Sequence, residues 1–223
     1  MVVTELAWLT GSSGPVTTEG KEATEHALSV QDEWCVRNAP AIPKGRESRG
    51  VGLFQQVEDP SICLLTAHWK SAEQHKIWLE SPENKTVFPG LKDHFQLEKT
   101  FLFHLNEVEL FNTSGAVGEV SLLKSPIISV GRVTVAAEKR QAFDQGWKEV
   151  KGILEEFAKP NTVKSGWRIE KEDEALEEFV FACGWPSVER HGEFATTEDF
   201  QKYASVLLAF ARSRDVKHYQ RIL

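Results

Sequence analysis

The sequence predicts an α+β fold made of two consecutive β-α-β-β-α-β repeats within its 223 residues. One observation is an internal repeat: the motif Trp-x-Ser-x-Glu-x-His occupies residues 69–75 and returns 116 residues later at residues 185–191. A second is that Gly50 and Gly166 match at the same offset. A third is the order of apolar segments, which is the same in both halves. A repeat period near half the chain length indicates a duplicated domain.

The first repeat is expected to cover residues 1–111. Its apolar pattern predicts, in order, a strand over 3–9, a helix over 23–34, strands over 51–57 and 61–69, a helix from Ser71 and a strand over 101–110. The first helix has apolar residues at helical spacing and ends before Pro40. The segment Glu58-Asp59-Pro60 has the turn residues of a hairpin between the two middle strands.

The second repeat is expected to cover residues 125–223, after a linker over residues 112–124 that begins with short, small and polar residues. It repeats the same order: a strand over 127–135, a helix over 143–157, strands over 164–170 and 178–185, a further helix and a closing strand. One helical face carries Phe143, Trp147, Val150, Leu154 and Phe157. Pro160 ends this helix, and a polar turn over 171–174 separates the next two strands.

Two such repeats form the split-βαβ, or ferredoxin-like, arrangement. Each sheet of this kind carries helices on one face only, so its other apolar face needs a partner. The duplication supplies a second sheet as that partner. We therefore expect two ferredoxin-like domains that form an intramolecular α/β barrel. The protein is then either a monomer that is an internal pseudo-dimer or, through free edge strands, a homodimer.

Composition and charge limit the classes of protein to which this chain can belong. A hydrophobic fraction of 41% is sufficient for a core, and a net charge of −7 predicts no binding to nucleic acid or to an anionic membrane. No basic segment precedes an apolar run at the start, and no stretch is long enough to span a bilayer, so a cytoplasmic location is expected. Cys35, Cys63 and Cys183 lie in apolar patterns, which predicts buried, reduced thiols.

The repeated motif resembles a known type of domain. An apolar strand ends in Trp, a Ser opens a helix, and Glu, His and an aromatic residue follow, as in the antibiotic-biosynthesis-monooxygenase type of the dimeric α/β-barrel superfamily. The resemblance covers both halves and is strongest over residues 61–88 and 177–203. Members usually build a barrel from two chains, and this chain resembles the tandem members that carry both domains. They include cofactor-free monooxygenases of polyphenolic polyketides, haem-degrading enzymes, decarboxylases, isomerases and proteins without known chemistry.

The resemblance implies one of two functions. The first is a cofactor-independent enzyme of secondary metabolism that acts on a hydrophobic, aromatic or polyketide-like small molecule. Its reaction would be monooxygenation with O2, or a proton-shuttled cyclisation or isomerisation. The second is a non-catalytic protein on the same scaffold that binds a small molecule or serves in a stress response. A shared fold does not select between them.

The motif contains residues with structural and with catalytic explanations. Ser71 and Ser187 stand at helix N-cap positions, and the Glu two residues later favours the positive end of the helix dipole. His75 and His191 lie near the starts of the same helices. Either they pack as structural residues, or they face a cavity as proton acceptors, because imidazole titrates near neutral pH. They are the candidate catalytic residues.

Three candidates for the substrate-binding wall surround the first motif. Trp69 ends a predicted strand and Trp78 follows the motif, and both are explained either by core packing or by contact with a flat ring system. His68 is matched by Gly184 in the second repeat. This difference between the two repeats is expected where one repeat keeps a ligand pocket and side chains fill the other. Neutral sequence divergence after the duplication produces it too.

Two polar residues in apolar strands complete the candidate wall. His104 follows Phe101-Leu102-Phe103 and corresponds approximately to His218 in the second repeat. Either its ring nitrogens are hydrogen-bonded within a buried polar network, or the residue belongs to the functional site. Arg132 either meets a carboxylate or phenolate in a cavity or points outward from its strand.

No cofactor and no metal is predicted. The sequence has no phosphate-binding Gly-rich loop, no GxSxG elbow and no HExxH zinc helix. In the haem-degrading members a tryptophan that presses on the haem matches Trp78, but Phe88 and Ala204 occupy the positions that correspond to the iron-binding histidine. Neither side chain binds iron, so haem is expected only if another residue such as His94 substitutes.

Overall fold

The computed structural model describes residues 2–113 and 117–223, which form two compact units. The first unit contains Met1–Thr113 and Tyr219–Leu223, and the second contains Ser114–His218. Of the linker expected over residues 112–124, Ser114, Gly115 and Ala116 lie outside the described residues.

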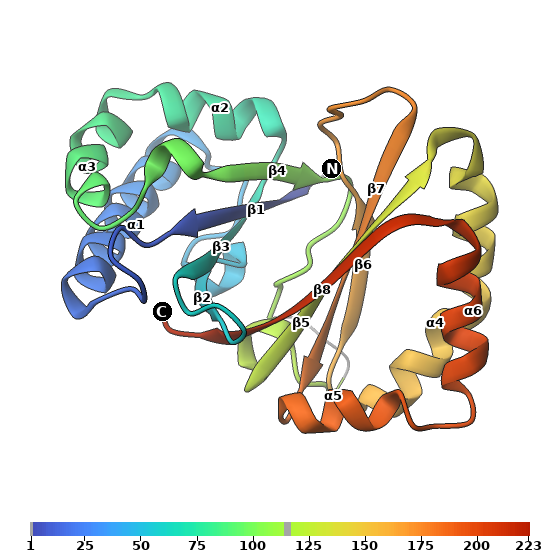
Figure 1. Ribbon diagram of the computed structural model, residues 1–223. Coiled ribbons are helices and arrows are strands. Elements are labelled where there is room, and N and C mark those ends of the chain that lie inside the picture. The colour runs from blue at the N-terminus through green and yellow to red at the C-terminus, as the bar shows by residue number, and fades with distance from the viewer. Residues whose placement is uncertain (1, 114–116) are drawn as a thin grey trace. The chain divides into compact units, whose positions relative to one another are not determined.

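The first unit follows the predicted order with one additional helix. Its elements are β1 (Val3–Thr10), α1 (Thr18–Asn38), β2 (Gly52–Gln56), β3 (Ile62–Trp69), α2 (Ala72–Glu80), α3 (Pro82–Lys92) and β4 (Phe101–Leu105). The strands lie in the order β4-β1-β3-β2 and pair antiparallel, and residues 219–221 of the chain pair with β2. The three helices cover one face of this sheet (Figure 1).

Two local features of the first unit differ from the sequence prediction. The last strand was expected to reach residue 110 but ends at Leu105, and Glu107 has a positive φ of 53°. This backbone conformation turns the chain out of the strand. Helix α3 was not predicted; it begins at Pro82, and the Ser81 hydroxyl accepts a hydrogen bond from the Asn84 N–H at 3.1 Å. Proline in the first helical turn and serine at the N-cap are both favourable there.

The second unit repeats this arrangement. Its elements are β5 (Ile127–Ala136), α4 (Arg140–Ala158), β6 (Val163–Trp167), β7 (Leu176–Trp185), α5 (Val188–Phe194), α6 (Phe200–Phe210) and β8 (Ala211–Arg221), of which the residues up to His218 belong to this unit. The strand order is β8-β5-β7-β6. Helix α4 buries Phe143, Trp147, Val150 and Leu154 against the sheet, as its spacing predicted, and ends before Pro160.

The α+β class and the ferredoxin-like element order are therefore confirmed. The closed intramolecular barrel is not confirmed: among the described residues the strands of the first unit lie in the open order β4-β1-β3-β2, and those of the second in the order β8-β5-β7-β6. None of the described helices has the length and apolar character needed to cross a membrane. All three cysteines are buried and unpaired, as expected.

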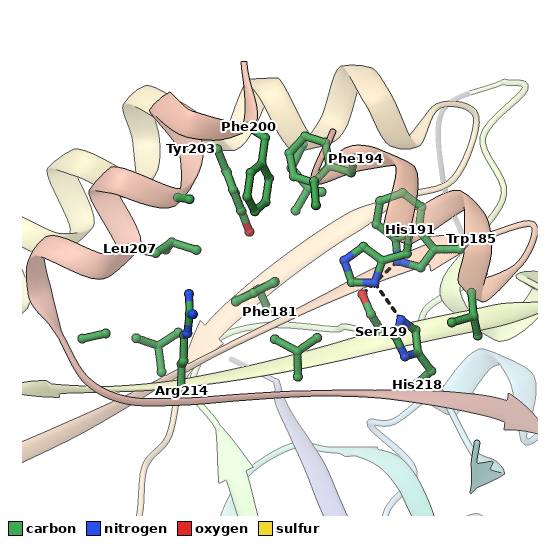
Figure 2. Close-up of a pocket in the computed structure, with 18 residues that line it drawn as sticks. Ser129, Phe181, Trp185, His191, Phe194, Phe200, Tyr203, Leu207, Arg214 and His218 are labelled. Atoms are coloured by element: carbon green, nitrogen blue, oxygen red, sulfur yellow. Dashed lines mark hydrogen bonds between the residues drawn. The ribbon is translucent and has the colours of Figure 1, made fainter. Parts of the chain in front are cut away.

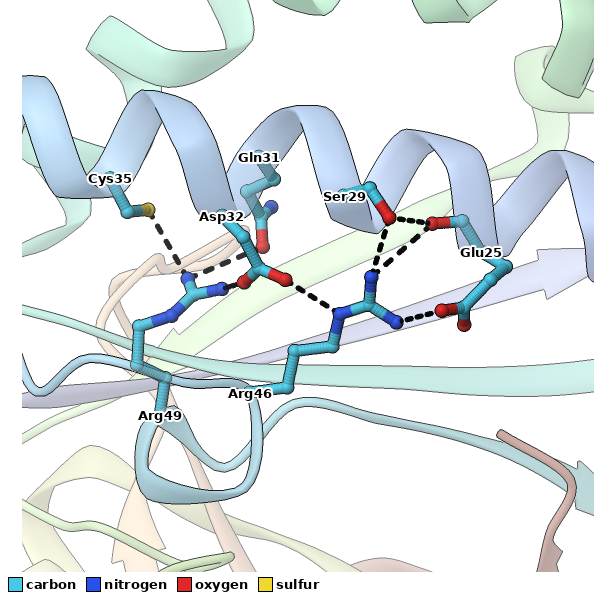
Figure 3. Close-up of polar contacts among 7 residues, drawn as sticks. All are labelled: Glu25, Ser29, Gln31, Asp32, Cys35, Arg46 and Arg49. Atoms are coloured by element: carbon cyan, nitrogen blue, oxygen red, sulfur yellow. Dashed lines mark hydrogen bonds and ion pairs between the residues drawn. The ribbon is translucent and has the colours of Figure 1, made fainter.

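The loop that joins α1 to β2 is attached to α1 by two arginines (Figure 3). Arg49 is only 1% exposed; its guanidinium pairs with the Asp32 carboxylate and donates to the Cys35 sulfur at 3.2 Å. Arg46 donates to the other Asp32 oxygen at 2.6 Å and to Glu25 at 2.5 Å. Charge-assisted bonds to one carboxylate thus hold both arginines, and with them the start of β2.

The two motif serines cap their helices as predicted. The Ser71 hydroxyl accepts from the Gln74 N–H at 3.2 Å, and the Ser187 hydroxyl accepts from the Arg190 N–H at 3.3 Å. We expect Ser71→Ala and Ser187→Ala each to lower the free energy of unfolding by about 1 kcal/mol, because one helix N–H loses its partner. Urea unfolding measures this, with Ser71→Gly as the matched control that should cost only a few tenths of this amount. Equal losses in the Ala and Gly variants would contradict a capping role.

Candidate functional site

In the first unit the repeated motif forms a buried cluster. The Trp69 indole stacks on the His75 imidazole with ring centroids 4.6 Å apart and donates its N–H to Glu5 Oε2 at 2.6 Å. His75 Nδ1 hydrogen-bonds His104 Nε2 at 2.8 Å, and His75 Nε2 lies 3.4 Å from Glu5 Oε2. Each of these four side chains is at most 4% exposed.

Strand register explains why these residues meet. Val3 on β1 lies opposite Trp69 on β3, so Glu5, two residues further along β1, is on the same face of the sheet. On the other side of β1, Glu5 lies opposite His104 on β4. The Ser71 cap then starts α2 so that His75 is placed over Trp69.

The second unit contains the same arrangement with one change. Trp185 stacks on His191 at 4.5 Å, and His191 Nδ1 hydrogen-bonds His218 Nε2 at 2.7 Å. The Trp185 N–H donates to the Ser129 hydroxyl at 2.8 Å. Because Ile127 is opposite Trp185, Ser129 holds the place that Glu5 holds in the first unit. Both units therefore contain a Trp–His–His group, and they differ in the acceptor beside the indole.

Burial controls the charge of the first cluster. Desolvation raises the pKa of Glu5 to about 7, although the Trp69 hydrogen bond and the nearby His104 and Arg49 oppose the shift. Desolvation also lowers the pKa of His75 to about 3, and His104 contributes in the same direction. Both shifts favour the neutral forms, so near neutral pH His75 is uncharged and Glu5 is close to its midpoint.

A cavity of about 280 Å³ lies between the helices and the sheet of the first unit. Glu5, His75 and Trp78 reach it, together with Gln31 and a largely aliphatic wall. Among the described residues that line it, Glu5 is the only one with an ionisable carboxyl, and none is Lys or Arg.

A larger cavity of about 370 Å³ lies in the corresponding place in the second unit. His191 and His218 are at one end, and aromatic rings form much of the wall (Figure 2). These rings belong to Phe181, Trp185, Phe194, Phe200 and Tyr203. Phe181 enters the cavity over Gly131, where an added Cβ would lie 2.2 Å from its ring, so β5 needs glycine at this point.

The structure brings together most of the predicted site residues. His75, Trp69 and His104 form the first cluster, and Trp78 lines the first cavity. His191 lines the second cavity. In place of Trp78 the second cavity has Phe194, as the repeat offset predicted.

His68 and Arg132 do not lie in either cavity. Side chains alternate along a strand, so His68 is on the face of β3 opposite Trp69, where it accepts the Phe111 N–H at 3.2 Å. Arg132 is on the face of β5 opposite Ser129 and is ion-paired with Glu178 at 2.5 Å. Neither residue therefore lines these two cavities, since each faces the other side of its sheet.

Sequence reasoning missed Glu5, Ser129, Tyr203 and Arg214. Glu5 could have been found from the sequence, because it is a carboxylate within the apolar strand Val3–Thr10. Nothing in the local sequence points to Ser129 or Arg214, because their place in a cavity wall depends on strand register. Among the described residues, no group of three or more His, Cys, Asp or Glu side chains is arranged so that it could hold a metal ion.

No model of a known protein family matches the sequence, and no curated protein sequence matches it. Solved structures resemble it along its whole length. An anthrone oxidase-like protein has a TM-score of 0.65 at 12% identity, covering 100% of this chain and 92% of that one. A "putative monooxygenase" from Fusobacterium nucleatum has a TM-score of 0.58 at 6% identity, covering 100% and 93%.

A second "putative monooxygenase", from Lactobacillus acidophilus, has a TM-score of 0.53 at 10% identity, covering 99% of this chain and 93% of that one. At such identities the likeness concerns the fold and not the reaction. The chain thus shares its fold with an anthrone oxidase-like protein and with two proteins described as putative monooxygenases, in agreement with the fold that the resemblance implies.

Proposed function

We propose that the protein is a cofactor-independent enzyme that oxygenates a hydrophobic, aromatic or polyketide-like molecule in the cavity of the second unit. The observation that carries this proposal is the His191–His218 pair at the end of an aromatic cavity. A paired imidazole at a cavity wall is suited to general base chemistry, because a second histidine can share the proton that the first accepts. The volume, about 370 Å³, is in the usual range for small-molecule sites.

The proposed reaction begins with proton transfer from an acidic C–H or phenol of the substrate to His191. The resulting carbanion, or the phenolate that shares its charge with ring carbon, gives one electron to O2, and the two radicals combine at carbon to form a peroxide. Return of the proton and loss of water then leave a carbonyl. In total, a CH2 group and O2 become C=O and H2O, so the substrate supplies all the electrons and no external reductant is needed.

The first cavity fits this reaction less well. His75 lines the smaller cavity, but it is 1% exposed and its two ring nitrogens lie beside His104 and Glu5. His191 is partly exposed and lines the larger cavity. We therefore assign the reaction to His191, with Trp185 as the ring that holds it in place.

The test is oxygen consumption with a hydroxylated anthrone, corrected for the spontaneous reaction without protein. We expect turnover, with one atom of ¹⁸O₂ in the product carbonyl. Ala204→Trp, which fills the second cavity, should abolish turnover, and Ala27→Trp, the matched change in the first cavity, should leave most of it. If the wild-type protein binds the anthrone without turnover, the protein is a ligand-binding member of this fold. Unchanged turnover in Ala204→Trp would contradict the assignment to this cavity.

A further inference from the structure

The second cavity has one strongly charged side chain. Arg214 on β8 lines the cavity, and Figure 2 shows its guanidinium pointing inward toward Leu207 and Tyr203. None of the described residues that line this cavity is acidic, and no carboxylate among the described residues forms an ion pair with Arg214. The nearest acid in sequence, Asp215, pairs with Lys217 instead. Arg214 is an exposed residue of β8, and its guanidinium therefore reaches the apolar cavity from the solvent side without a counter-charge among the described residues.

The first cavity has the opposite character at equivalent places. Arg214 precedes His218 by four residues, and Thr100 precedes His104 by four residues and lines the first cavity. The acceptor beside the indole is Ser129 in the second cavity and Glu5 in the first. One cavity thus holds a cation and no acid, and the other holds an acid and no cation. Two cavities with these charges are not suited to the same ligand.

We propose that the second cavity binds a hydrophobic molecule that carries an anionic group, such as an aromatic carboxylate, and that Arg214 pairs with that group. The aromatic rings would hold the apolar body, and the guanidinium would hold the anion at the opposite part of the wall from the histidines. A guanidinium matches a carboxylate through two parallel hydrogen bonds. This inference deepens the proposed function, because it names the substrate class for the same cavity.

The experiment is calorimetric titration with three probes that share one ring system: 2-naphthoate, neutral 2-naphthol and cationic 2-naphthylmethylammonium, all at pH 7. We expect 2-naphthoate to bind the wild-type protein more tightly than the other two. Arg214→Gln should weaken 2-naphthoate binding roughly tenfold and leave 2-naphthol binding within about twofold. Lys217→Gln removes a charge from the same strand on the opposite face and should change neither.

Two further variants locate the binding site. Ala204→Trp should abolish 2-naphthoate binding, and Ala27→Trp in the first cavity should not. The proposal is overturned if 2-naphthoate does not bind, if Arg214→Gln leaves its affinity unchanged, or if Ala204→Trp still binds it. Binding is measured without turnover, so a protein that binds 2-naphthoate but does not oxygenate the anthrone would contradict only the proposed function. An enzyme that oxygenates the anthrone but binds 2-naphthoate equally well after Arg214→Gln would contradict only this inference. Circular dichroism of each variant confirms that it is folded.

Discussion

His191→Ala should lower kcat for oxygen consumption with the hydroxylated anthrone by about 10²–10⁴-fold, the usual loss when a general base is removed. The imidazole lines the second cavity and shares a 2.7 Å hydrogen bond with His218, which can share the proton that His191 accepts. KM should change much less, because the aromatic walls that bind the substrate remain. Initial rates of oxygen uptake over a range of substrate concentrations separate the two constants.

Two histidine variants serve as controls for this result. His26→Ala removes an exposed imidazole from α1 and should leave the rate unchanged. His75→Ala removes the equivalent motif histidine of the first unit, so it tells the two cavities apart. A large loss in His75→Ala with none in His191→Ala would transfer the reaction to the first cavity. Parental rates in both variants would rule out motif histidines as the base.

Glu5→Gln should become more stable relative to the wild-type protein as the pH rises from 4.5 to 8. In the folded wild type the carboxyl has a pKa of about 7 because it is desolvated, against 4.5 as the ordinary value. A raised carboxyl pKa means that the folded state holds its proton longer than the unfolded state, so wild-type stability is lost as pH rises from about 4.5 to 7. The free energy of unfolding of Glu5→Gln minus that of the wild type should therefore rise by about 3 kcal/mol between pH 4.5 and 8, which follows from the size of the pKa shift.

His75 acts in the opposite direction and must be separated from this effect. Its lowered pKa of about 3 means that stability is lost as pH falls below its ordinary value of 6.5. Both proteins contain His75, so the difference between Glu5→Gln and wild type isolates the carboxyl. Urea unfolding at pH 4.5, 6 and 8 measures it, with Glu33→Gln on the exposed face of α1 as a control that should give a flat difference. A flat difference for Glu5→Gln as well would show that burial does not hold this carboxyl neutral.

The motif shows how far local pattern can predict a site. Ser71 and Ser187 were predicted as caps and are caps, since capping depends on residues within one helical turn. The pairing of His75 with His104, and of His191 with His218, was only suggested by approximate correspondence. Each pair joins a helix to a strand more than twenty residues away in sequence, and no local spacing encodes that contact.

Two of the predicted wall residues lie outside both cavities for one physical reason. His68 and Arg132 are polar residues in apolar strands, but a strand has two faces and both of these residues are on the face away from the cavity. Glu5 satisfies the same description and is on the cavity face. The difference between these residues is set by strand register.

The sequence by itself determined the duplicated α+β fold, the order of elements and the capped helix that places the motif histidine. These follow from periodicity, turn residues and an exact repeat, all of which act over short distances along the chain. Only the tertiary structure decided that Glu5 belongs to one cavity and Ser129 and Arg214 to the other. That assignment depends on which face of a sheet each side chain occupies and on which strands lie side by side, and these contacts join residues distant in sequence.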